Sequence, residues 1–139
     1  MANITDNNID VESFDAGSES NKGYEFELIG TDGMTGTGIY LTVVGKNSDA
    51  VSDWTSEIVD KLWEDEAMAQ RRGKQVKKKS YKYVKAQNVQ GAVQRVTGWR
   101  NVKQPFSRKL LETVLARNPH FIEQIIEESD DLGNFTKAR

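Results

Sequence analysis

The chain has 139 residues and a mass of 15.7 kDa, which leaves room for one compact domain with tails. It holds no cysteine and a single histidine, so disulfides, thiolate nucleophiles and cysteine-ligated metals are excluded and histidine-based catalysis is disfavoured. No apolar run approaches the ~20 residues that span a bilayer, and no secretory leader is recognisable. We therefore expect a soluble, unexported protein with no membrane partner.

The net charge of −2 conceals three charged segments of alternating sign. All charged side chains are acidic in residues 1–21, basic in residues 71–85, and acidic again in residues 121–134. This alternation favours charged contacts with itself or with another protein over uniform attraction to one polyanion.

The composition divides the chain into three parts. Residues 1–22 are rich in Asn, Asp, Ser and Glu with few apolar side chains, which predicts a flexible acidic arm. Residues 23–135 should form a single α+β domain that includes the basic segment 71–85, and residues 136–139 are a polar tail.

Alternating apolar and polar residues predict two strands, at residues 24–29 and 39–44. The glycine-rich stretch between them predicts a loop, so the two strands form an N-terminal antiparallel β-hairpin. A hairpin alone is marginal in water, and helices must therefore cover its apolar face.

Apolar residues at helical spacing then predict about four helices. The first begins after Gly45, where Asn47, Ser48 and Asp49 offer N-cap side chains, and extends to about Arg72. We expect its apolar stripe of Val51, Trp54, Ile58 and Leu62 to cover the hairpin. The second extends from residue 81 to residue 98, and residues 99–105 form a connector.

Two further helices follow this connector, at residues 107–118 and 119–133. Pro119 ends the first and begins the second, which predicts a tight helical hairpin. The expected fold class is α+β, with the β-hairpin packed on the helices.

Patterns that carry catalysis or cofactor binding are weak in this chain. Glu123 and Glu127 lie one helical turn apart, but a solvated helix face predicts the same spacing. His120 fits a residue near a helix cap better than a general base. The glycine-rich residues 30–38 lead into a strand, whereas a phosphate-binding loop leads into a helix. We therefore predict that the protein is not an enzyme, binds no cofactor, and has no catalytic or metal-binding residue.

The basic segment makes nucleic-acid binding an alternative function, because Tyr81 and Tyr83 interleave with its cations. A solvated helix face or linker explains the same pattern, and a sequence pI of about 5.5 argues against a polyanion as the main partner. The candidate polyanion contacts are Arg71, Arg72, Lys77, Lys78, Lys79 and Lys82.

The chain has three tryptophans, and large residues on helix stripes usually pack in the core. Because the expected core is shallow, the alternative is that at least one lies at an oligomer or partner surface. The candidate partner-binding residues are Trp54, Trp63, Trp99 and Phe135.

Several short motifs occur together in the second half of the chain. Val-Thr-Gly-Trp-Arg-Asn-Val at residues 96–102 and Gln-Pro-Phe-Ser at residues 104–107 precede a leucine-rich helix. Asn118-Pro119, an isoleucine-rich acidic helix and Asn134-Phe135 follow it. With the predicted strand that leads through a glycine into Asn-Ser-Asp at residues 47–49, this combination resembles the tail assembly chaperones of long-tailed bacteriophages over residues 24–135.

This resemblance implies a non-catalytic protein. Such chaperones are often made in a short form and a longer, frameshifted form, and this chain resembles the short form. Its partner would be the helical, aggregation-prone tape measure protein, kept soluble in the host cytoplasm until tail tube subunits polymerise around it. Contact with tail tube subunits and self-association are further possibilities. The acidic arm and the basic segment depart from the family pattern, which leaves a structural virion protein of the tail or head–tail joint as an alternative.

Overall fold

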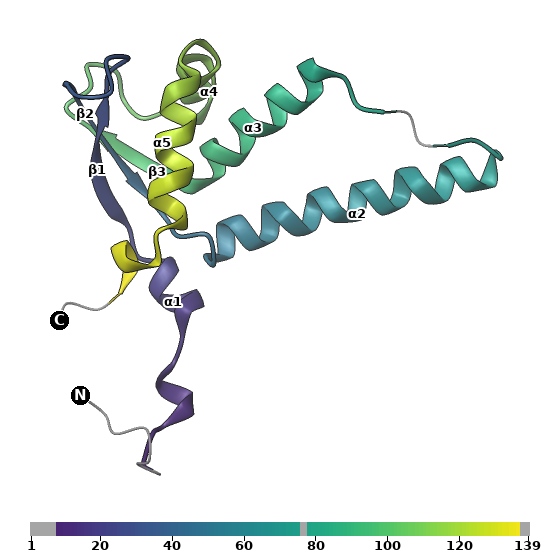
Figure 1. Ribbon diagram of the computed structural model, residues 1–139, viewed down its shortest axis with the longest axis horizontal. Coiled ribbons are helices and arrows are strands. Elements are labelled where there is room, and N and C mark those ends of the chain that lie inside the picture. Colours follow the sequence, from purple (N-terminus) through teal and green to yellow (C-terminus); the bar gives the residue numbers. More distant parts are fainter. Residues whose placement is uncertain (1–7, 76–77, 137–139) are drawn as a thin grey trace.

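The computed structural model describes residues 8–75 and 78–136 (Figure 1). In chain order its elements are η1 (Val11–Ser13), α1 (Ala16–Ser20), β1 (Tyr24–Ile29), β2 (Gly36–Val43), α2 (Asp49–Arg71), α3 (Tyr81–Arg95), β3 (Val96–Arg100), α4 (Arg108–Arg117), α5 (Pro119–Asp130) and η2 (Leu132–Phe135). The predicted α+β class is confirmed.

The three strands form one antiparallel sheet in the order β1-β2-β3. The predicted hairpin is present, with Tyr24 paired to Val43 and Phe26 to Leu41. On its other side β2 pairs with β3, where Leu41 lies opposite Trp99. The middle strand β2 therefore has a partner on both sides, and β1 and β3 are the edges.

The third strand corrects the prediction of a helix through residue 98. Helix α3 ends at Arg95, and the chain enters β3 directly at Val96. The helix-like spacing of Val93 and Val96 is misleading, because both side chains are buried in the same core from different elements. The free edge of β2 and the β-branched and aromatic residues of β3 outweigh local helix propensity here.

Helices α3, α4 and α5 pack against the sheet and build the core. Leu41 and Val43 come from the sheet, Val93 from α3, Leu115 from α4 and Ile125 from α5, and each is at most 1% exposed. The predicted helical hairpin of α4 and α5 is present, with Ser107 as the N-cap of α4.

Helix α2 does not cover the hairpin, contrary to the expectation from its apolar stripe. It projects from the body, and α3 rises above it at an angle (Figure 1). None of the residues in the described core cluster belongs to α2. Leu62 on the expected buried stripe is 45% exposed, because α3 and α5 occupy the place expected for this helix.

The segment before β1 also differs from the flexible arm expected for residues 1–22. Ser20, at the end of α1, is 1% exposed, and its carbonyl accepts a hydrogen bond from the N–H of Gly45 at 2.7 Å. Asn21 and Asp49 exchange two hydrogen bonds, of 3.2 and 2.8 Å. These polar contacts dock the end of the arm, and composition alone does not reveal them.

Candidate functional site

The base of α2 is fixed against α3 by Trp54. Ser48 caps α2 by accepting a hydrogen bond from the N–H of Val51 at 3.4 Å. The next turn places Trp54 beside Gly91, where the absence of a side chain lets the indole ring approach the backbone of α3. Beyond this contact α2 leaves the body, so Trp54 marks the point where the two helices diverge.

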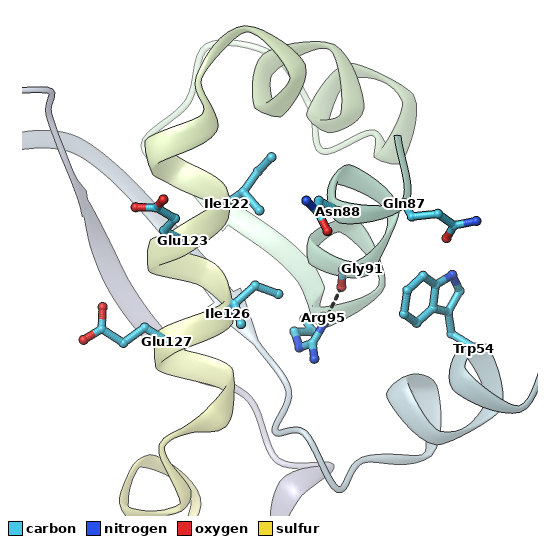
Figure 2. Close-up of a pocket in the computed structure, with 9 residues that line it drawn as sticks. All are labelled: Trp54, Gln87, Asn88, Gly91, Arg95, Ile122, Glu123, Ile126 and Glu127. Carbon is cyan, nitrogen blue, oxygen red and sulfur yellow. Dashed lines mark hydrogen bonds between the residues drawn. The ribbon is translucent and has the colours of Figure 1, made fainter. Parts of the chain in front are cut away.

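A groove opens where α2, α3 and α5 diverge (Figure 2). Its volume is about 520 Å³. Ile122 and Ile126 point into it from α5, and Trp54 faces them from α2 across the open space. Ile122 and Ile126 are partly buried against the core, and the groove wall they form is apolar.

Glu123 and Glu127 belong to the rim, and their side chains point away from the groove (Figure 2). This agrees with the solvated helix face expected for them. The amides of Gln87 and Asn88 lie at the α3 side of the groove and supply neutral hydrogen-bonding groups.

Among the described residues that line this groove, Arg95 is the one cation. Its Nη1 donates to the carbonyl of Gly91 at 2.8 Å, and its Nη2 lies 4.0 Å from Oδ1 of Asp130. Its Nε is buried without a hydrogen-bond partner among the described residues. Burial lowers the pKa of Arg95, and the nearby Asp130 opposes this effect, so the guanidinium is a charged group held in a partly apolar place.

The groove continues along α3 toward the start of that helix. A second hollow of about 220 Å³ shares Asn88, Ile122 and Glu123 with the first. Tyr81 and Val84 extend its lining and are 82% and 48% exposed. The two hollows adjoin at these shared residues and form one furrow bordered by α2, α3 and α5, a kind of surface that receives the apolar face of a helix.

The structure separates the four candidate partner-binding residues. Trp54 lies in the groove, and Trp63 is 67% exposed on α2. Trp99 packs edge-on against Phe106 at 5.2 Å between ring centroids, and its indole N–H donates to the carbonyl of Gln104 at 2.9 Å. Phe135 is 3% exposed in the core, so its role is packing rather than partner contact.

The basic candidates gather where α2 ends and α3 begins. Arg71 and Arg72 close α2, Lys78 follows in the linker, and Lys82 lies in the first turn of α3; all four are exposed. Lys79 lies 3.6 Å from Asp65 and 5.0 Å above the ring of Tyr83, which joins the linker to both helices. Lys77 lies outside the described residues.

Sequence reasoning missed several groove residues. Ile122, Ile126 and Gly91 are not among the candidate residues that the sequence provides. A glycine in the middle of a predicted helix is a signal of close approach by another group, and here that group is Trp54. Arg95 carried no signal, because its place at the groove depends on tertiary packing.

Over the described residues, no group of three potential metal ligands comes together. His120 packs against the neighbouring ring of Phe121 at 4.3 Å between centroids. None of the helices described is both long and apolar enough to pass through a membrane. No family model, curated protein or solved structure matches this chain.

Proposed function

We propose that this protein is a phage tail assembly chaperone, a non-catalytic protein that holds a helical segment of the tape measure protein in the furrow between α2, α3 and α5. The observation that carries this proposal is the open apolar space between Trp54 and the pair Ile122 and Ile126. Large apolar side chains that face one another without filling the space between them are typical of a binding groove.

The chemistry of the furrow fits the apolar face of a helix. Ile122 and Ile126 lie one turn apart on α5, and Tyr81 and Val84 continue the apolar surface on α3. A helix in this furrow buries residues at its own i, i+3, i+4 and i+7 positions. Arg95 offers a charged donor to a carboxylate on the bound helix, which fixes the direction and register of binding.

The furrow also fits reversible binding. It is bordered by exposed polar side chains such as Asn88 and Glu123, and polar rims favour exchangeable rather than obligate contacts. A chaperone of the tape measure protein must release it when tail tube subunits assemble in the host cytoplasm. Tail tube subunits are a secondary partner in this proposal.

The test is co-expression with the tape measure protein encoded in the same genome, followed by a pull-down on this chain. The wild-type chain should keep the tape measure protein soluble and co-purify with it. Trp54→Ala combined with Ile122→Glu should abolish co-purification in a variant that circular dichroism shows to be folded, and Met34→Glu, at an exposed loop position, should have no effect. An insoluble tape measure protein, or full binding by the double variant, contradicts the proposal. Recovery of the chain in purified particles at fixed copy number favours a virion protein instead.

A further inference from the structure

Helix α2 carries a second face, opposite the groove. Trp63 follows Trp54 by nine residues, and at about 3.6 residues per turn this places the two rings on opposite sides of the helix. Trp54 faces α3, whereas Trp63 is 67% exposed and Val59, one turn earlier, is 36% exposed. Tryptophan is among the residue types most enriched at the centres of protein interfaces. Trp63 has this character, because it is held in solvent on a projecting helix.

Uncharged side chains continue this outer face along the helix. They recur at intervals of three or four residues, as in helices that pair along a seam. All of them are exposed in the structure. This row of side chains, which we call the seam, consists of Ser52, Ser56, Val59, Trp63, Ala67 and Gln70.

We infer that this seam binds the same seam of a second copy of the chain, with the two α2 helices antiparallel. The pairing is two-fold symmetric, so each contact occurs twice. Its central layers place Val59 of one copy beside Trp63 of the other. Ser56 and Ala67 flank this centre and let the two helix backbones approach.

The charges of α2 select the antiparallel direction. From Asp49 to Glu66 its charged residues are acidic except for Lys61, whereas Arg71, Arg72 and Lys74 follow at its end. Parallel pairing would place like charges side by side. Antiparallel pairing brings Arg71 of each copy to Asp53 of the other, which is favourable at both ends. Near the centre Asp60 and Glu64 of opposite copies approach, and this repulsion limits the affinity.

The surface area is sufficient for such a dimer. The chain exposes 10276 Å², whereas a compact monomer of this mass exposes about 7,300 Å². The arm before β1 and the projecting α2 both contribute to this excess. A stable interface needs about 800 Å² from each partner, and a helix of 23 residues, about 34 Å long, provides a seam of that order.

This inference stands apart from the proposed function, because the groove lies on the other side of α2. Trp54 and the furrow remain open in the dimer. The dimer would therefore present two furrows on opposite sides of its helix pair.

The first test is the molar mass of the full chain by light scattering and sedimentation over a range of concentrations. The wild-type chain should reach twice 15.7 kDa. Trp63→Glu should raise the dimer Kd about 30-fold or more without changing circular dichroism, since the side chain is exposed. Met34→Glu, also at an exposed apolar residue, should remain dimeric.

The second test is a charge swap that fixes the direction. Arg71→Glu and Asp53→Arg should each raise the dimer Kd about 2- to 10-fold, and the double variant should restore it. The two residues lie 18 positions apart, or about 27 Å along one helix, so restoration requires contact between copies. Glu64→Lys should lower the Kd by replacing the central repulsion with attraction to Asp60.

A wild-type chain that stays monomeric at all concentrations overturns the inference, and the outer face then serves a different partner. A dimer unaffected by Trp63→Glu overturns it as well. If the groove variants lose tape measure binding but still dimerise, the furrow and the seam act independently, and the dimer inference stands without the proposed function.

Discussion

The indole ring of Trp54 lies against the backbone of Gly91, with Cη2 at 3.3 Å from the position that a β-carbon on residue 91 would occupy. This contact joins the base of α2 to the middle of α3. It also sets the width of the groove, because Trp54 faces Ile122 and Ile126 from across it (Figure 2). The glycine therefore acts on the groove geometry although it has no side chain.

Gly91→Ala should raise the free energy of unfolding by about 0.5 kcal/mol, because alanine is favoured over glycine inside a helix by up to about 1 kcal/mol. Part of that gain is lost because the Trp54 ring must shift by a few tenths of an ångström, which the open groove allows. Gly91→Leu should instead push the ring away and destabilise the protein by about 1–3 kcal/mol. Urea unfolding measures both changes, and a stabilising leucine variant would contradict the contact.

Leu115→Ala should destabilise the protein by about 2–5 kcal/mol, because it removes a side chain that is fully buried between the sheet and the helices. Leu62→Ala should change stability by no more than about 0.5 kcal/mol, since this side chain is 45% exposed on α2. Thermal unfolding of the two variants at low protein concentration separates them. Equal losses would mean that α2 packs on the core in solution.

The sequence predicts those parts of the fold that local signals define. The hairpin follows from period-two alternation, and Ser48, Ser107 and Pro119 each occur where a helix begins. The cover of the sheet could not be predicted, because an apolar stripe shows that a helix has a partner but not which one. Val51 and Leu62 lie on the same stripe but differ in solvent exposure, at 6% and 45%.

The third strand and the groove share a different reason for being missed. Val96 and Trp99 become strand residues because β2 offers an unpaired edge, which depends on the rest of the fold. Trp54 was a candidate from its residue type alone, whereas Arg95 and Ile126 join it only through the packing of α3 and α5. Residue type therefore identified one member of the site, and the remainder required tertiary structure.

The carboxylate of Asp32 should titrate well below an ordinary aspartate. The Thr35 hydroxyl, and then the backbone N–H groups of Thr35 and Met34 at 2.8 and 2.9 Å, lower the pKa of Asp32 to about 2. Its stabilising effect is therefore complete above the unfolded pKa of about 3.9 and is lost as the pH falls toward 2. NMR titration of the side-chain carboxyl should give this midpoint. The stability difference between wild type and Asp32→Asn should shrink over the same range, and a constant difference would contradict the turn geometry.

Gln124 should be a larger contributor to stability than its polar side chain suggests. It accepts a hydrogen bond from the backbone N–H of Ile29 at 2.7 Å and donates one to the carbonyl of the same residue at 2.9 Å, which ties α5 to the edge strand β1. Gln124→Ala should cost about 1–3 kcal/mol, because it leaves both backbone groups part-buried and unpaired. Glu123→Ala, an exposed neighbour on the same helix, should cost no more than about 0.5 kcal/mol.

The Gln124→Glu variant tests the direction of these bonds. A carboxylate still accepts from the N–H of Ile29 but places a negative oxygen against its carbonyl, so the loss of stability at pH 7 should exceed that of Gln124→Ala. Contact with the carbonyl raises the pKa of the introduced carboxyl in the folded state, and its protonated form donates the missing hydrogen bond. Relative to wild type, the variant should therefore regain stability as the pH falls from 7 to 4. Urea unfolding at both pH values measures this recovery, and an equal deficit at both would show that Gln124 does not donate to Ile29.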